Sequence, residues 1–179
     1  EQISYLLYMG SGFGVLIAQN LASMIVSAEL MAISALPIIA FGEHHDSLTV
    51  RRYAAIHFFA GALILIGLSS LKTDITTCQI NLDSLKSMDR AYFFIFIGLL
   101  INCGCAPMFS WISDSYTKSS IYGNAVLACF TTKASAYVLM KIFLGSDILF
   151  YLGIFTCFTV LPFAILEKDA KKLLNYGLI

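Results

Sequence analysis

Long apolar stretches alternate with short polar ones along the whole chain. A helix that crosses the hydrocarbon core of a bilayer needs about 20 predominantly apolar residues, and most of these stretches approach that length. We therefore predict an all-α, polytopic transmembrane helix bundle that forms a single membrane domain of about six spans, one of them broken. The predicted spans cover residues 3–18, 20–42, 53–71, 91–112, 119–141 and 148–166.

Composition separates this chain from soluble proteins. Hydrophobic residues make up 59% of its 179 residues and charged residues 12%, whereas a soluble domain carries about 25% charged residues. The net charge of zero gives no indication of a nucleic-acid partner. Because one apolar run starts almost at Glu1 and another opens at Leu173, we expect a fragment or a shortened form of a longer protein.

The basic residues of the loops indicate an orientation. Loops with more Lys and Arg generally face the cytoplasm, and the alternate loops of this chain hold six basic residues on one side and four on the other. We therefore predict that the richer side is cytoplasmic. The richer side has Arg51, Arg52, Lys118, Lys168, Lys171 and Lys172, and the other has Lys72, Lys86, Arg90 and Lys141.

Two charged residues break the apolar pattern, since Glu29 and Lys133 lie near the middle of predicted spans. An ionisable side chain at the centre of a bilayer costs at least ~2.5 kcal/mol on insertion scales, and its presence usually has a functional reason. We therefore interpret Glu29 and Lys133 as candidate proton-transfer groups. The alternative is a buried ion pair between them that fixes the register of two helices.

The fourth predicted span contains an interruption. An amide, a glycine and a proline lie within the short segment from Asn102 to Pro107. Proline removes a backbone donor and clashes with the preceding turn, so we predict a broken helix. Such a break is tolerated at membrane depth only where it is buried in protein or lines water, and it marks ion pathways in transporters. Trp111 follows the break, and we expect Asp114 and Lys118 to cap and anchor the broken helix at the interface.

Three polar residues are predicted to share one depth. A helix rises about 1.5 Å per residue, which places Glu29, Asn102 and Lys133 near the middle of their spans. A row of polar groups from different helices at one depth is what a lateral, hydrated proton path requires. The Asn102 amide cannot take up and release a proton, but it can hold a chain of water molecules at the break.

Other polar residues carry weaker signals. His57, one turn into its predicted span, is a candidate proton carrier, although a single histidine is more often hydrogen-bonded within a bundle. Tyr137, one turn after Lys133, is expected either to hydrogen-bond towards it or to pack. Residues 43–46 are Glu, His, His and Asp, but adjacent residues do not converge on one ion, so we expect a solvated loop. The five cysteines show no metal-ligand spacing, and we predict no metal site.

Four segments together resemble a known family. The family is that of the antiporter-like membrane subunits shared by respiratory complex I and Mrp-type cation/proton antiporters. Among its branches, the segments look nearest to the MrpD type of the Mrp antiporters. The resemblance covers most of the chain and is weakest before Leu21 and across the long loop after residue 71. The segments are Ala28–Met31, the interrupted stretch 98–116, Thr131–Leu139 and Glu167–Tyr176.

The interrupted stretch departs from the family at two positions. The family reads roughly G-x-x-x-K-A-A-x-x-P-x-H-x-W-L-x-D-A-Y there, whereas this chain has Asn102 in place of the lysine and Phe109 in place of the histidine. The resemblance implies a proton-transfer chain made by a glutamate, which matches Glu29, and by lysines at the break and at Lys133. The departure at Asn102 removes one member of that chain.

The resemblance also implies a fold, a function and partners. Family members have two inverted five-helix repeats, and this chain would hold little more than the first. The implied function is that of a proton-translocating subunit of a multisubunit cation/proton antiporter or a respiratory complex I-type assembly. Its partners would be the lipid bilayer, other membrane subunits, protons and, as a further candidate ion, Na⁺. The implied location is the bacterial cytoplasmic membrane or the mitochondrial inner membrane.

No redox or nucleotide motif appears, so we expect no cofactor and no enzymatic activity in the chain itself. NADH and quinone chemistry would then belong to partner subunits. The alternative function is that of a truncated, non-conducting homologue that acts as a scaffold or is a gene remnant, which Asn102, Phe109 and the missing second repeat favour. An intramembrane hydrolase has little support, because no Ser, His and Asp are paired at one depth within the spans.

Overall fold

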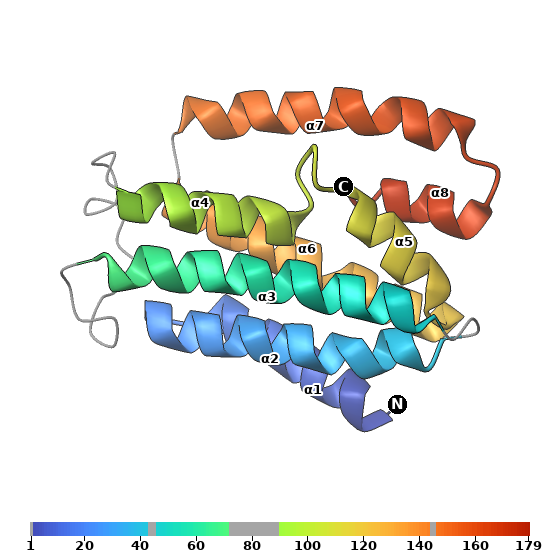
Figure 1. The fold of residues 1–179 in the computed structure, drawn as a ribbon, viewed down its shortest axis with the longest axis horizontal. Helices are drawn as coiled ribbons and strands as arrows, with labels where there is room; N and C mark the ends of the chain where they lie inside the picture. The colour runs from blue at the N-terminus through green and yellow to red at the C-terminus, as the bar shows by residue number, and fades with distance from the viewer. Residues whose placement is uncertain (1, 43–45, 72–89, 144–145) are drawn as a thin grey trace.

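The computed structural model describes residues 2–42, 46–71, 90–143 and 146–179. All regular secondary structure in these residues is helical, and it forms the bundle shown in Figure 1. The predicted loop at 43–46, apart from Asp46, and the charged connection 72–89 lie outside the described residues. The helices are α1 (Gln2–Ile17), α2 (Leu21–Ala40), α3 (Ser47–Ser69), α4 (Arg90–Cys103), α5 (Ser110–Lys118), α6 (Ile121–Ile142), α7 (Asp147–Leu166) and α8 (Ala170–Tyr176).

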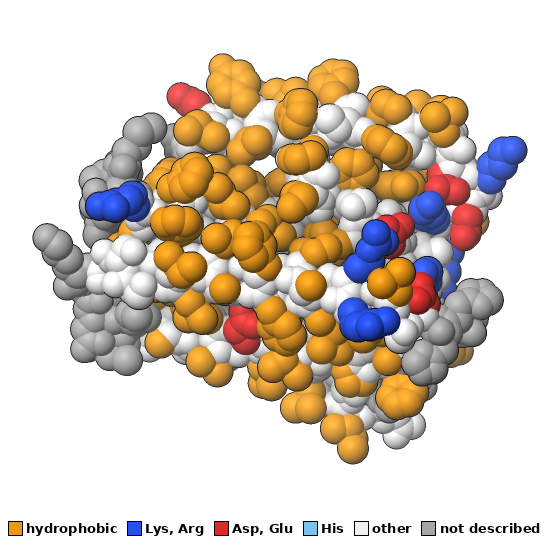
Figure 2. Space-filling model, viewed as in Figure 1, with side chains coloured by type: hydrophobic (Ala, Val, Ile, Leu, Met, Phe, Trp, Pro, Cys, Tyr) orange, Lys and Arg blue, Asp and Glu red, His pale blue; other side chains and the backbone are white. Residues whose placement is uncertain are grey.

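Four of the described helices, α2, α3, α6 and α7, are long and apolar enough to cross a membrane. Helices α1 and α4 are apolar but shorter. Figure 2 shows a broad apolar band over the middle of the bundle, with most charged side chains gathered at one end. This distribution is the one expected of a polytopic membrane protein, in which the bilayer covers the apolar band.

Helix α3 begins at Ser47, six residues before the predicted span at 53–71. Its N-cap is Asp46, whose Oδ1 accepts a hydrogen bond from the Leu48 N–H at 3.0 Å. Such a cap satisfies one of the free donors of a first turn. The hydropathy pattern misses this start because the first turns are polar. The earlier start places His57 ten residues into the helix, about 15 Å along its axis, and therefore far deeper than one turn.

The segment between α7 and α8 uses its charged residues as caps. Glu167 Oε1 accepts a hydrogen bond from the Asp169 N–H at 3.3 Å, and its Oε2 lies 3.2 Å from Lys172 Nζ. These two donors hold the pKa of the Glu167 carboxyl below its ordinary value. Asp169 caps α8 by accepting a hydrogen bond from the Lys171 N–H at 2.9 Å. The Lys171 ammonium donates to the carbonyl of Ser119, and so docks α8 against the end of α5.

Helices α3 and α4 lie side by side at close range (Figure 1). A Cβ added at Gly98 would lie 2.7 Å from the Ala60 carbonyl oxygen, and one added at Gly67 would lie 2.8 Å from that of Ala91. Only glycine permits this approach, and small residues are the usual means by which helices pack closely in membranes. The α3–α4 pair therefore gives the bundle a rigid wall.

The main core lies among helices α1 to α6, and a smaller apolar cluster joins the segment before α5 to α7 and α8. Helix α7 runs along the opposite side of the bundle from α1 and contacts α8 (Figure 1). It contributes few buried side chains, so its surface is mostly exposed. The largest fully buried side chains of the main core are Tyr8, Ile38, Tyr53, Leu68, Ile95, Ile112, Tyr116 and Leu127.

Candidate functional site at the helix break

The predicted interruption divides the fourth span into two helices, since α4 ends at Cys103 and α5 begins at Ser110. Gly104 has a φ of +76°, which other residues rarely adopt, and a Cβ there would collide with Ile112 Cδ1. Pro107 lies in the turn between the helices, where its missing backbone donor does no harm. The sequence therefore ends α4 at a glycine and not at the proline.

Trp111 ties the two helices of the break together. Its indole N–H donates to the Ile101 carbonyl at 3.2 Å, and the Gly104 N–H donates to the same carbonyl at 3.1 Å. On the other side of the break, the Ala106 N–H donates to Thr156 Oγ1 of α7 at 3.2 Å. These backbone groups, which the break releases from the helix, thus find partners within the protein, as is required at membrane depth.

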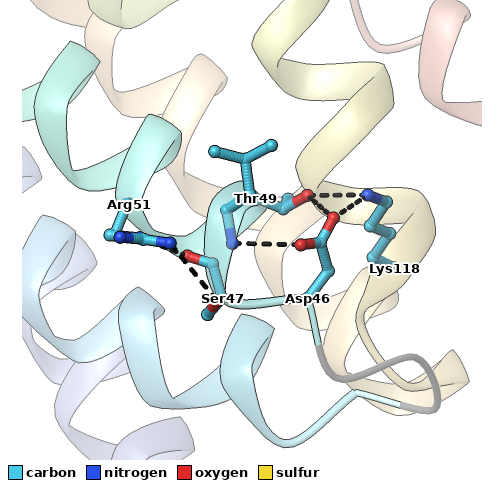
Figure 3. A network of polar contacts seen from close by, with 6 residues as sticks. Asp46, Ser47, Thr49, Arg51 and Lys118 are labelled. Atoms are coloured by element: carbon cyan, nitrogen blue, oxygen red, sulfur yellow. Dashed lines mark hydrogen bonds and ion pairs between the residues drawn. The ribbon is translucent and has the colours of Figure 1, made fainter.

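Asp114 and Lys118 lie in α5, but they act differently from each other. Asp114 is in the middle of the helix, so it caps neither end, contrary to our expectation. Lys118, in the last turn, donates to Asp46 Oδ2 and, at 2.8 Å, to Thr49 Oγ1 (Figure 3). The Lys118 ammonium and the Thr49 hydroxyl hold the pKa of Asp46 well below its ordinary value. Lys118 thereby anchors the end of α5 to the start of α3.

Helices α2, α3, α4 and α6 enclose a small polar cavity, which we call the inner cavity. Its volume is about 20 Å³, enough for one water molecule. Three of the candidate residues, Glu29, His57 and Asn102, line it from three different helices. The full lining is Ala28, Glu29, Met31, Ala32, His57, Asn102, Thr131 and Ser135.

Glu29 reaches from α2 onto α3. A Cβ added at Gly61 would collide with Glu29 Oε1, so the absence of a side chain at this position makes room for the carboxylate. Gly61 lies one helical turn after His57 on the same helix. The carboxylate is therefore held in the space between α2 and α3, beside the inner cavity.

His57 and Asn102 leave polar atoms of the inner cavity unpaired. The His57 side chain is 4% exposed and lies beside that of Asn102. Among the described residues, neither His57 Nε2 nor Asn102 Oδ1 has a hydrogen-bond partner. Buried polar atoms are normally hydrogen-bonded, so two unpaired atoms around one water-sized cavity suggest a chemical role for the cavity.

Lys133 lies apart from the inner cavity. Its Nζ donates to Thr132 Oγ1 at 3.1 Å and to the Leu178 carbonyl at 3.4 Å, and its side chain is exposed in the described chain. The ion pairs within the described part of the chain do not include one between Glu29 and Lys133. A pair of these two residues is therefore not what fixes the register of α2 and α6.

Tyr137 and Phe109 make packing contacts. The Tyr137 ring lies 5.7 Å from Lys141 Nζ near the end of α6. Phe109 is buried against Phe163 of α7 and Tyr176 of α8, with ring centroids 5.4 and 6.4 Å apart. The residue that stands where the similar family has a histidine is thus part of the apolar contact between the break and the last two helices.

Sequence reasoning misses a group of buried hydroxyls beside the inner cavity. Tyr8 OH hydrogen-bonds Thr131 Oγ1 and donates to the Leu127 carbonyl at 3.0 Å. Tyr53 and Tyr116 are fully buried, and their hydroxyls lie near Thr131 without a hydrogen-bond partner among the described residues. Each residue of the group comes from a different helix, so no spacing along the chain announces it.

The residues around the break supply carboxylate, imidazole, amide and hydroxyl groups. In the ranges that the structure describes, no three His, Cys, Asp or Glu side chains lie close enough to hold a metal ion. Cys103 and Cys105 flank Gly104 as free thiols, and Cys103 Sγ lies 3.9 Å from the Thr132 carbonyl. The chemistry that these groups share is the transfer of protons.

Comparison with known proteins finds a family that covers most of the chain. The family described as NADH:quinone oxidoreductase/Mrp antiporter, TM, matches residues 18–179. NADH-quinone oxidoreductase subunit N of Desulforudis audaxviator (strain MP104C) is 28% identical over 148 residues, which cover 77% of this chain and 29% of that protein. A Na(+)/H(+) antiporter protein of Alkalihalophilus pseudofirmus, its A-type subunit, is 24% identical over 191 residues, covering 97% of this chain and 24% of that protein. The chain thus spans less than a third of the length of these relatives.

Solved structures share the fold. A chain of the Mrp complex from Dietzia sp. DQ12-45-1b has a TM-score of 0.79 at 21% identity, covering 97% of this chain and 36% of its own length. A chain of the membrane-bound sulfane sulfur reductase, an archaeal respiratory membrane complex, has a TM-score of 0.79 at 19% identity, with 97% and 39% covered. A chain of respiratory complex I from Thermus thermophilus has a TM-score of 0.76 at 19% identity, with 97% and 41% covered.

Proposed function

The chain belongs to the NADH:quinone oxidoreductase/Mrp antiporter transmembrane family, and from this membership we propose that it moves protons within the membrane. It would act as one subunit of a multisubunit cation/proton antiporter or a respiratory complex I-type assembly, with Na⁺ as the candidate counter-ion. It would correspond to little more than one five-helix repeat of the larger fold. The bacterial cytoplasmic membrane or the mitochondrial inner membrane is the proposed location.

The observation that carries this proposal is the composition of the inner cavity. The Glu29 carboxylate, the His57 imidazole and the Asn102 amide line a space that fits one water molecule. An ionisable group is costly at membrane depth, and a water-sized space beside it lets a proton reach the carboxylate and leave it. This arrangement supports Glu29 as a proton-transfer group.

Glu29 and Lys133 would act as a coupled pair across α6. A proton on Glu29 removes a buried charge, whereas a proton on Lys133 creates one, and each charge favours the opposite charge on the other group. The protonation of one group therefore shifts that of the other, and the two titrate as a unit. Asn102 takes no proton in this scheme, and its amide orients water at the break between them.

Partner subunits are part of the proposal. Lys133 is exposed in the described chain although it lies in the interior of α6, and a charge that faces lipid at this depth is unfavourable. Most of the surface of α7 is exposed as well. We propose that other membrane subunits cover these surfaces. Any NADH or quinone chemistry would belong to those subunits, and this chain would need no cofactor of its own.

The test is proton flux through the chain, purified with its native partners and reconstituted in liposomes that contain a pH-sensitive dye. Glu29→Gln removes a charge while keeping the shape of the side chain, and Lys133→Ala removes the ammonium. Each variant is expected to abolish flux and leave assembly intact. Glu167→Gln is the control, because this carboxylate follows the end of α7. Undiminished flux in either variant would remove that residue from the path.

Asn102→Lys tests whether the amide limits transport. We expect higher flux in this variant, because lysine supplies a group that takes up and releases a proton at the break. An unchanged rate would show that the amide does not limit transport. A wild-type chain and an Asn102→Lys chain that both assemble with their partners but conduct no protons would favour the non-conducting scaffold.

A further inference from the structure

A second polar cavity lies between α3 and α5, and we call it the outer cavity. Its volume is about 220 Å³, which gives room for several water molecules. It contains a basic and an acidic side chain near the charged end of the bundle that Figure 2 shows. Its lining is Thr49, Arg52, Ile56, Ser110, Trp111, Asp114 and Ser115.

A layer of three buried rings, those of Tyr53, His57 and Trp111, lies between the outer and the inner cavity. The His57 ring centroid is 4.2 Å from that of Tyr53 and 4.6 Å from that of Trp111. Trp111 lines the outer cavity, whereas His57 lines the inner one. The rings therefore close the space between two polar cavities, and any proton that passes from one to the other must cross this layer.

Of these three rings, only that of His57 exchanges protons readily near neutral pH. The indole of Trp111 is a donor only, and the phenol of Tyr53 releases its proton near pH 10 in its ordinary state. His57 Nε2 has no hydrogen-bond partner within the described ranges and is buried. Packing alone does not explain an unpaired buried nitrogen, but a proton-carrying role does.

We propose that His57 carries protons between the outer cavity and Glu29, a role that rests on the proposed function. A hydrated proton of the outer cavity binds one ring nitrogen when the Trp111 indole moves aside. The imidazolium then releases the proton of its other nitrogen to the Glu29 carboxylate through one water molecule in the inner cavity. The ring is neutral again, the outer water has lost one proton, and the carboxylate has gained it. Rotation of the ring restores the starting arrangement.

The groups around the ring suit this direction of transfer. Glu29 faces it from α2 and offers a negative charge on the inner side, and the neutral Asn102 amide lies beside it on α4. Tyr53 of α3 packs on the ring. In the outer cavity, Asp114 of α5 attracts hydrated protons, and Arg52 of α3 limits that attraction.

The first test compares two histidine substitutions in the flux assay. His57→Gln keeps hydrogen-bonding capacity but cannot carry a proton, and we expect a loss of about 100-fold, the lower end of what a positioned acid–base group contributes. His44→Gln makes the same chemical change outside the spans and should stay within about twofold of wild type. Unchanged flux in His57→Gln, or equal losses in both variants, would overturn the proposal.

A second measurement does not depend on flux, and it applies even if His57→Gln fails to fold. The chain has three histidines, so a variant with Gln at positions 44 and 45 keeps His57 alone for nitrogen-15 solid-state NMR in liposomes. We expect its ring N–H to exchange with D₂O and its protonation to follow the external pH. A ring proton that never exchanges would overturn the proposal.

The two proposals fail in different ways. A wild-type chain that assembles with its partners but shows no flux would overturn both of them. Flux that is lost in Glu29→Gln but kept in His57→Gln would overturn the role of His57 alone and leave the proposed function in place.

Discussion

Helices α6 and α7 are both long and apolar enough to span a membrane, yet they occupy opposite kinds of environment. Helix α6 has a polar middle, from Thr131 to Ser135, and buries residues along its length against α1, α2 and α4. Helix α7 is more uniformly apolar, and its buried residues are only Thr156 and Val160. The less apolar of the two helices is thus the one inside the bundle.

This difference shows how burial works in a bilayer. Lipid tails are as apolar as leucine, so an apolar face gains little by turning inward, and helices associate through close packing and polar contacts. The polar middle of α6 therefore marks a helix that meets others, and α6 completes the inner cavity. The uniform apolarity of α7 marks a helix that faces lipid or partner subunits. Substitutions at matched residues of the two helices and of their neighbours test this difference.

The largest expected effect comes from leucines of the two helices. Leu127 of α6 is 0% exposed, whereas Leu161 of α7 is 56% exposed. Leu127→Ala should lower the free energy of unfolding by about 2–5 kcal/mol because it leaves a cavity, and Leu161→Ala by less than about 0.5 kcal/mol. Reversible unfolding in mixed micelles measures both. Equal losses would show that α7 is packed as tightly as α6.

A second matched pair consists of glycines. A Cβ at Gly98 of α4 would press on the Ala60 carbonyl, whereas one at Gly153 of α7 meets nothing within 4 Å. Gly98→Ala should therefore cost about 1–3 kcal/mol through overpacking. Gly153→Ala should stabilise the helix by up to about 1 kcal/mol, since alanine is the better helix former. The same unfolding assay decides, and a neutral Gly98→Ala would mean that α3 and α4 separate easily.

Gly61→Ala tests function at little cost in stability. Its new Cβ would collide with the end of the Glu29 side chain, which is flexible and can move away. We expect stability close to that of wild type and a loss of proton flux of about tenfold, which corresponds to about 1.4 kcal/mol. Gly10→Ala is the control, because its Cβ meets nothing within 4 Å. Full flux in Gly61→Ala would show that the position of the carboxylate is unimportant.

The smallest effect concerns the Asp46–Lys118 contact at the charged end (Figure 3). Since Lys118 lowers the pKa of Asp46 from its ordinary value of 3.8, the contact stabilises the fold above that pH. Its contribution disappears as the pH falls below 3.8 through the lower pKa of the folded state. Asp46→Asn should cause a small loss of stability at pH 7 and none at the acid end. A loss that is equal at both would exclude the ion pair as its cause.

The class of fold and the place of the break follow from the order of residues along the chain. Apolar stretches of nearly spanning length predicted an all-α transmembrane protein, and segments such as Glu167–Tyr176 pointed to the family; both conclusions are confirmed. The interruption between Asn102 and Pro107 was located in the same way. These predictions work because helix length and backbone satisfaction in lipid are local properties of the chain. The roles of Glu29 and Lys133 stay predictions.

Which polar residues meet depends instead on how the helices pack. The folded chain places His57 deep in α3 beside Asn102 and Glu29, and it places Lys133 on a different side of α6. Hydropathy gives the depth of a residue in a span, but not the direction in which its side chain points around the helix axis. That direction depends on contacts between helices far apart in the sequence, such as the one in which Gly61 makes room for the carboxylate.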